Sequence, residues 1–165
     1  MIDAIIVNYK TPDFAARAVS AVQGPGVKVF VTDNSGDLTI VGPQASAAHI
    51  DVQCWTPGRN TFFAEGNNYW FERTSSPYIL LLNPDVEISH DDVMALRRAL
   101  EAHPEVWGVA PRLLNEDGTP QNYLQRLPVS SDLAVVVASS SGVFEKTESR
   151  TLGLSGFGLA YTAVC

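Results

Sequence analysis

Three polar clusters in this sequence each follow directly on a short apolar run that has the character of a buried strand. The clusters are Asn8-Tyr9, Asp33-Asn34-Ser35 and Asn83-Pro84-Asp85. Ligands of open α/β sheets bind at the carboxyl ends of the strands. If these strands are parallel, the three clusters lie along one edge of the sheet. Their amide, hydroxyl and carboxylate groups are then placed to hold a polar ligand.

Asp85 is the residue whose place in the sequence most clearly indicates a chemical role. It follows a continuous apolar run at residues 78–82, and Pro84 restricts the backbone beside it. A carboxylate in such a place is suited to hold a hard divalent cation against a diphosphate, where the cation neutralises charge on a leaving phosphate. The alternative interpretation is structural, because Asn-Pro-Asp is also common turn chemistry.

Asp33 has a similar pair of interpretations. Its carboxylate is able to accept hydrogen bonds from a base or a ribose, whereas the run at residues 33–36 is equally typical of a turn. Farther along the chain, Asn60 and the group Gly66-Asn67-Asn68 indicate a phosphate-binding segment, because small residues at a helix start let backbone N–H groups approach a phosphate. No Ser/His/Asp arrangement, HExxH helix or Walker-type loop is present.

The elements that must position these residues alternate between strands and helices, which predicts an α/β fold with a largely parallel sheet. Strands are expected at residues 4–7, 27–31, 50–55, 78–82 and 106–110. Three helices are expected: one capped by Thr11 with Pro12 at its first position, one from about Ala64 toward Arg73, and one with a capping pair at Ser89 and Asp92. A hairpin is expected at 113–123, and a loop around one apolar run is expected beyond Pro128.

Composition limits the classes of partner. The 165 residues are 45% hydrophobic and 18% charged, which is typical of one globular domain, and the net charge of −7 disfavours nucleic acid and anionic membrane surfaces. The start does not resemble a secretory signal, and the apolar run at 133–138 is too short to span a bilayer. The two cysteines, Cys54 and Cys165, indicate reduced thiols. The expected location is the cytoplasm, with the inner face of the membrane as a peripheral site.

Five motifs, taken in order, resemble the family 2 glycosyltransferases, in particular their rhamnosyltransferase-like members. The motifs are residues 5–9, 31–35, 60–68, 80–85 and 111–121, and the resemblance extends over about residues 2–128. Five motifs in a fixed order are far more specific than any one of them alone.

The resemblance implies a GT-A fold, in which a mostly parallel, Rossmann-like sheet is flanked by helices. It also implies a nucleotide-diphosphate sugar donor, a Mg²⁺ or Mn²⁺ ion and a role in cell-surface polysaccharide biosynthesis. Asp85 matches the last position of the family's DXD-like metal motif, and Asp33 matches the carboxylate that contacts the base or the ribose. The donor-binding residues implied by the resemblance are Val7, Asn8, Tyr9, Asp33, Asn34, Asn60, Asn67, Asn68 and Asn83.

Two residues depart from the family pattern. Phe62 stands where the family often has glycine, and Glu65 stands at a site usually held by a small residue. A bulky ring and a carboxylate beside a diphosphate could hinder donor binding.

The acceptor half of the family has no match in the sequence. Inverting transfer needs a carboxylate that deprotonates the acceptor hydroxyl, and in the family this base lies well after the metal motif. The last carboxylate here is Glu148, and residues 154–160 are similar to the segment that leads into the acceptor half, so no catalytic base is assigned. We expect a nucleotide-sugar-binding domain at residues 1–128 and a truncated or irregular start of the acceptor side at 129–165. Such a chain is expected to transfer sugar weakly or not at all, and its uncovered apolar surface favours a homodimer or a second subunit.

The sequence thus predicts the donor domain of a glycosyltransferase that uses a UDP- or dTDP-linked sugar. The acceptor hydroxyl belongs to an unidentified glycan or lipid-linked acceptor. One alternative is a non-catalytic module or scaffold that holds a nucleotide sugar. The other is a sugar nucleotidyltransferase, which is disfavoured because no glycine-rich basic loop follows the first strand.

Overall fold

The computed structural model describes residues 1–36, 52–104, 106 and 108–121, together with the backbone of three later strands. Expectations for residues 154–160 and for Cys165 concern residues outside this set. The described elements are β1 (Ile2–Asn8), α1 (Pro12–Val22), β2 (Val27–Asp33), β3 (Val52–Trp55), α3 (Phe62–Phe71), β4 (Tyr78–Leu82), α4 (His90–Ala102), β5 (Gly108–Pro111), β6 (Asp132–Ala138), β7 (Glu145–Arg150) and β8 (Ala163–Val164).

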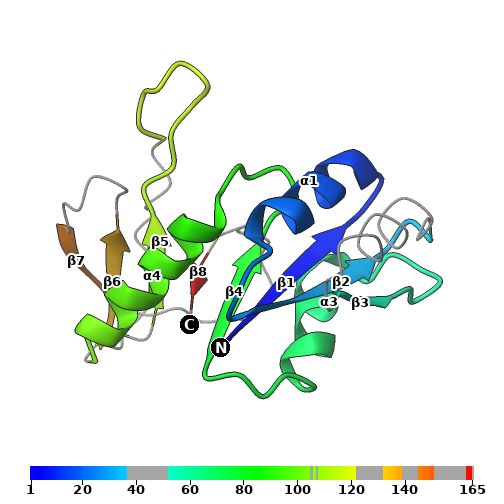
Figure 1. Ribbon diagram of the computed structural model, residues 1–165, viewed down its shortest axis with the longest axis horizontal. Coiled ribbons are helices and arrows are strands. Elements are labelled where there is room, and N and C mark those ends of the chain that lie inside the picture. Colours follow the sequence, from blue (N-terminus) through cyan, green and yellow to red (C-terminus); the bar gives the residue numbers. More distant parts are fainter. Residues whose placement is uncertain are drawn as a thin grey trace.

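The described strands form one sheet in the order β3-β2-β1-β4-β8-β5-β6-β7. Strands β1 to β4 are parallel, as the alternation of strands and helices predicts. β8 pairs antiparallel with both β4 and β5, so the sheet becomes mixed beyond β4 (Figure 1). The expected α/β architecture is confirmed.

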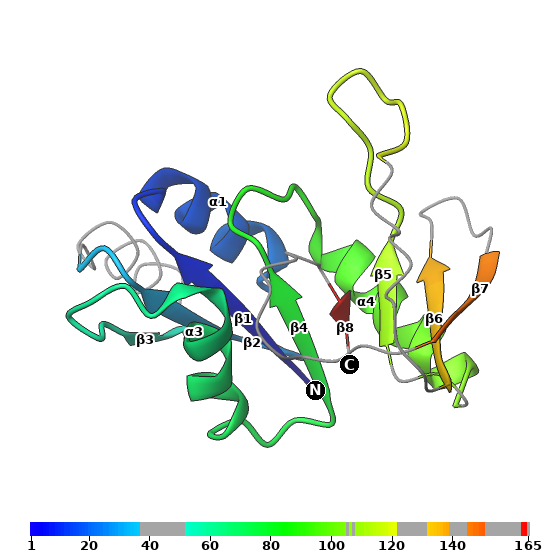
Figure 2. The same ribbon diagram turned by 180° about the vertical axis from the view of Figure 1, so that it is seen from behind.

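Helices cover both faces of the parallel part of the sheet. α1 and α4 lie on one face and α3 lies on the other, which Figure 2 shows from behind. The larger core fills the space under α1 and α4, where Ile6, Val31, Leu82 and Leu96 are at most 2% exposed. A smaller cluster under α3 is centred on Ile5, Phe30 and Trp70, so alternate residues of β1 serve opposite faces.

α3 approaches the sheet closely through Gly66. A Cβ atom placed on Gly66 would lie 3.1 Å from both γ-methyl groups of Val7 and 3.3 Å from that of Thr32. The Thr32 hydroxyl donates a 2.8 Å hydrogen bond to the Gly66 carbonyl. Glycine, a poor residue for a helix interior, is therefore the residue that lets this helix dock.

Two predicted helix caps have different outcomes. Ser89 and Asp92 form a complete capping box at the start of α4, as predicted. Thr11 is the N-cap residue of α1 and Pro12 is its first residue, as predicted, but the Thr11 side chain makes no capping hydrogen bond. The Thr11 hydroxyl instead donates to Asn8 Oδ1 at 2.9 Å, because a nearby side-chain acceptor competes with the helix end.

The serines expected to form a loop around the apolar run after Pro128, at residues 130–131 and 139–141, lie outside the described residues. The apolar run is strand β6, parallel to β5, and residues 145–150 form β7 at the edge of the sheet. β7 has the sequence Glu-Lys-Thr-Glu-Ser-Arg, whose charges suit an edge strand but hide it from a search for apolar alternation. β8 is only two residues long, which is too short for a recognisable pattern.

The predicted hairpin after β5 is present. Leu114 and Pro120 form an antiparallel bridge, and the turn between them has Gly118 at φ 80°. Asp117 accepts hydrogen bonds from the Thr119 hydroxyl and amide, which lowers the pKa of its carboxyl group. Within the described residues, none of the helices has the length and hydropathy needed to cross a membrane.

Candidate functional site

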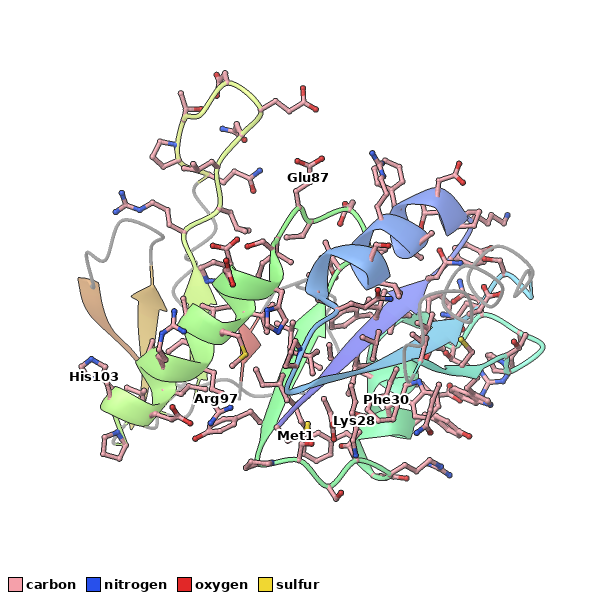
Figure 3. The ribbon with its side chains drawn as sticks, in the orientation of Figure 1. Met1, Lys28, Phe30, Glu87, Arg97 and His103 are labelled. Atoms are coloured by element: carbon pink, nitrogen blue, oxygen red, sulfur yellow. The ribbon has the colours of Figure 1, made fainter. Side chains whose placement is uncertain are left out.

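The polar clusters of the sequence do lie at one edge of the sheet. In the strand register, Asn8 is opposite Asp33, Thr32 is opposite Trp55, and Ile6 is opposite Leu82. The residues that follow these positions are therefore neighbours at the carboxyl ends of β1 to β4. In Figure 3, Glu87 marks the loop that leaves this edge, while Met1 and Lys28 lie at the opposite end of the sheet.

Asn8 and Asp33 form the centre of a buried hydrogen-bond network. Asn8 Nδ2 donates to Asp33 Oδ1 at 3.0 Å and to the Ser35 hydroxyl at 3.2 Å. Asn8 Oδ1 accepts from the amide and the hydroxyl of Thr11. The Ser35 hydroxyl also accepts from the amide of Lys10 at 2.7 Å. The ends of β1 and β2 are thus held together by side chains as well as by the sheet.

The turn at the end of β2 uses only part of the Asp33 carboxylate. Oδ1 accepts from the amide of Ser35 at 3.0 Å, which is the predicted turn chemistry. Oδ2 is buried and has no hydrogen-bond partner among the described residues. Burial, and then the charge of Asp33, raise the pKa of the nearby Cys54 thiol, so this thiol stays protonated. A buried carboxylate oxygen without a partner is costly, which favours a binding role for Asp33 in addition to the turn.

Asn34 joins the β2 turn to the segment before α3. Its Oδ1 accepts from the amide of Thr61 at 2.9 Å and from the Thr61 hydroxyl at 2.8 Å. The backbone amide of Asn34 donates to the backbone carbonyl of Asn8 at 2.9 Å. Asn34 Nδ2 has no partner among the described residues. Asn8 and Asn34, both of which the sequence predicts as site residues, therefore belong to one hydrogen-bond network.

Asn60 shapes the start of α3. Its Oδ1 accepts from the amide of Phe62 at 2.8 Å. The helix begins at Phe62 rather than near Ala64 as predicted, and Phe62 has φ 57°. A left-handed backbone of this kind favours glycine, which is the physical reason why a phenylalanine is unusual at this position.

The remaining residues of the predicted donor-binding set differ in placement. Val7 is half-buried against Gly66, and Tyr9 is 45% exposed with the Lys10 ammonium 5.0 Å from its ring centroid. Asn67 is buried, and its Oδ1 has no partner among the described residues. Asn68 is exposed on α3, and the structure does not bring it into the network of Asn8, Asp33 and Asn34.

Glu65 does not present an unpaired charge to the edge of the sheet. It forms a short ion pair with Arg59, which lies in the segment before α3. Both side chains are largely exposed, at 62% for Arg59 and 47% for Glu65. The carboxylate that the sequence suggested as an obstacle is therefore neutralised by a cation that the sequence analysis did not single out.

Asp85 occupies a tight turn after β4. The carbonyl of Asn83 accepts from the amide of Val86 at 3.2 Å, so the structural interpretation of Asn-Pro-Asp holds. The turn leaves the Asp85 side chain exposed, beside a groove of about 480 Å³ between α1 and the loop after β4. Phe14, Arg17 and Glu87 also line this groove. Turn and ligand roles are compatible here, because the turn presents the carboxylate to solvent.

Asp85 fits a divalent cation only as a single protein ligand. Within the described part of the chain there is no group of three or more His, Cys, Asp or Glu side chains that could enclose a metal ion. Mg²⁺ sites are commonly completed in another way, by one or two carboxylates and the phosphates of a substrate. The donor set at Asp85 agrees with a cation that is shared with a bound diphosphate.

Three threonine and serine residues support this site: the sequence does not single out Thr61, and it does not predict the contacts of Thr11 and Ser35. Thr11 orients the amide of Asn8, Ser35 bridges β1 to β2, and Thr61 is held by Asn34. Each is next to, or within three residues of, an asparagine or aspartate of the predicted set. Local side-chain to backbone bonding by these residue types is the signal that points to them.

Comparisons with known proteins agree with this arrangement. No family model matches the sequence. The chain is 30% identical over 122 residues to the low-salt glycan biosynthesis hexosyltransferase Agl10 of Haloferax volcanii, a match that covers 72% of this chain and 38% of the relative. The chain thus corresponds to less than half of the length of this relative.

Solved structures of two glycosyltransferases and of one synthetase have the same fold. A mannosyltransferase of Pyrobaculum calidifontis, in complex with GDP-Man and Mn²⁺, superposes with a TM-score of 0.61 at 14% identity and covers 69% of this chain and 35% of its own. TarS 1–349 of S. aureus, in complex with UDP-GlcNAc, gives 0.58 at 15% identity over 74% and 37%. A CMP-2-keto-3-deoxy-manno-octonic acid synthetase with CTP gives 0.51 at 13% identity over 67% and 51%. The chain therefore has the GT-A type of α/β fold, and most of its length is similar to part of a hexosyltransferase.

Proposed function

We propose that this chain is the donor-binding part of a glycosyltransferase, which holds a nucleotide-diphosphate sugar at the carboxyl edge of β1 to β4. The observation that carries the proposal is the connected network of Asn8, Asp33 and Asn34, in which Asp33 Oδ2 and Asn34 Nδ2 have no partner among the described residues. Free acceptor and donor atoms at one edge suit the hydroxyls of a ribose and the edge of a base. The hexosyltransferase relative and the GT-A neighbours support this proposal.

In this proposal each residue has a definite task. Asp33 accepts from the base or ribose, Val7 and Tyr9 line the nucleotide pocket, and Asn60 with Asn67 shapes the donor side of α3. Asp85, with Asn83 beside it, holds Mg²⁺ or Mn²⁺ against the diphosphate. When bound there, the cation neutralises negative charge on the leaving nucleoside diphosphate. The donor is a UDP- or dTDP-linked sugar, and the acceptor is a hydroxyl of an unidentified glycan or lipid-linked acceptor.

The proposal also includes three more specific assignments. They comprise the rhamnosyltransferase-like subtype of family 2, a donor domain at 1–128 followed by the start of an acceptor side, and a location in the cytoplasm or at the inner face of the membrane. A nucleotide-sugar-binding scaffold is the alternative in which residues 1–165 bind the donor without turnover. A nucleotidyltransferase shares the fold, but β1 is followed by Asn8-Tyr9-Lys10-Thr11 rather than by a glycine-rich basic loop.

Calorimetric titration tests the proposal. UDP, dTDP and GDP are titrated into the chain with and without Mn²⁺, and the same titrations are made with Asp85→Ala. Mn²⁺ is expected to strengthen binding of one nucleotide by at least about tenfold, and Asp85→Ala is expected to remove this enhancement, because one carboxylate completes the metal site only when phosphates are present. Asp117→Ala, which removes an exposed carboxylate in the hairpin after β5, is the matched control. A folded chain that binds none of the three nucleotides would contradict the proposal.

A further inference from the structure

Phe62 combines two features that are unfavourable for a folded chain. Its φ of 57° is a left-handed conformation that non-glycine residues rarely adopt. Its side chain is 74% exposed, so its own burial does little to offset the strain. Strained residues persist where the surrounding structure determines them, and they cluster at functional sites. The position of Phe62 therefore needs a cause outside its own contacts.

Hydrogen bonds of Phe62 and of the residue before it hold Phe62 in this conformation. Its amide donates to Asn60 Oδ1 at 2.8 Å. The preceding residue, Thr61, is 1% exposed and is fixed twice by Asn34 Oδ1, at 2.9 Å through its amide and 2.8 Å through its hydroxyl. The ring is thus presented to solvent from a segment that is anchored to the turn at the end of β2.

A second strained residue lies on the other side of the same turn. Lys10 has φ 60°, and its amide is bonded to the Ser35 hydroxyl at 2.7 Å. Lys10 adjoins Tyr9, which is 45% exposed. The β2 turn at Asn34 and Ser35 is therefore flanked by two strained segments, each of which carries an exposed aromatic ring. Asn34 itself is 7% exposed and has a free Nδ2 donor among the described residues.

The geometry points to Phe62 as a donor-contacting residue whose ring stacks on the nucleobase of the nucleotide sugar, an inference that rests on the proposed function. A base offers a flat π face to the ring and carbonyl acceptors to Asn34 Nδ2. Stacking of a base on an aromatic side chain does not depend strongly on which base is present. Phe62 therefore adds affinity for the nucleotide, while hydrogen bonding at Asp33 and Asn34 sets the choice of base.

Replacement of Phe62 by glycine separates this role from a structural one. Phe62→Gly relieves the left-handed backbone, so the melting temperature is expected to rise by about 2 °C. The same variant is expected to bind UDP, dTDP and GDP about tenfold more weakly in the presence of Mn²⁺, because the stacked ring is lost. Phe62→Tyr keeps a ring and is expected to retain the affinity. Phe71→Ala removes an exposed ring, 59% exposed, from the far end of α3 and is expected to leave it unchanged.

A titration of inorganic pyrophosphate with Mn²⁺ provides the base-free comparison. Its affinity is expected to be the same for the wild type and Phe62→Gly. An unchanged nucleotide affinity in Phe62→Gly, or an equal loss for pyrophosphate, would overturn the stacking role while leaving the donor site intact. A folded wild-type chain that binds no nucleotide would overturn the proposed function as well, so the two failures are distinguishable.

Discussion

At the scale of single residues, the ion pair of Arg59 and Glu65 lies at the start of α3, beside residues that are proposed to bind the donor. In this pair the Glu65 carboxylate neutralises the charge of the Arg59 guanidinium. Exposed ion pairs contribute about 0–1 kcal/mol, so Arg59 can exchange its partner for a phosphate at little cost. Glu65→Gln is therefore expected to raise the affinity for UDP with Mn²⁺ about threefold at low ionic strength. The gain is expected to shrink in 0.5 M salt, because screening weakens contacts between exposed charges.

The matched control for this variant is Glu72→Gln at the other end of α3. Glu72 pairs with Arg73 at 3.6 Å and is also exposed, so the change in net charge is the same in both variants. Titration calorimetry at two salt concentrations checks the prediction. An equal gain in both variants would show a general effect of net charge on a chain of charge −7 rather than a specific effect of freeing Arg59.

At the scale of elements, two helix starts that look alike in sequence have different physical roles. Ser89→Ala removes a complete capping box and is expected to lower the free energy of unfolding by about 1 kcal/mol without changing UDP affinity.

Thr11→Val keeps the shape of the side chain but removes the hydroxyl that orients Asn8. It is expected to weaken UDP binding severalfold through the Asn8–Asp33 contact. Thermal unfolding measures the stability of the two variants, and titration calorimetry measures their affinity for UDP. A loss of UDP affinity in Ser89→Ala but not in Thr11→Val would contradict these two roles.

The starts of α4 and α1 illustrate which parts of the fold and of the candidate site can be predicted from the sequence. Buried strands such as β4 and the capping box of α4 follow from local patterns, because apolar runs and Ser-x-x-Asp spacing have a direct structural cause. The strand-end cluster of Asn8 and Asp33 follows from them, since parallel strands end at one edge. The polar edge strand β7 and the two-residue β8 depend on pairing with other strands, which no local apolar pattern encodes. The contact of Thr11 with Asn8 is local, but a threonine before a helix is equally suited to a capping hydrogen bond, so the sequence does not decide between the two.

At the scale of the whole molecule, the candidate site consists of segments that are far apart in the chain and close at one sheet edge. Hydrogen exchange measures this arrangement directly, because ligand binding slows local opening of the backbone that it contacts. With UDP and Mn²⁺ present, peptides that contain residues 8–11, 33–36 and 58–66 are expected to exchange together more slowly, by about tenfold at saturation. Peptides from the second half of α4, within residues 96–102, are the internal control and are expected to be unchanged, because they lie beyond the first turn of this helix, which lines the groove together with Asp85. Slower exchange confined to α1 and the loop after β4 would instead place the nucleotide in the groove beside Arg17, and would contradict a donor site built on Asn8 and Asp33.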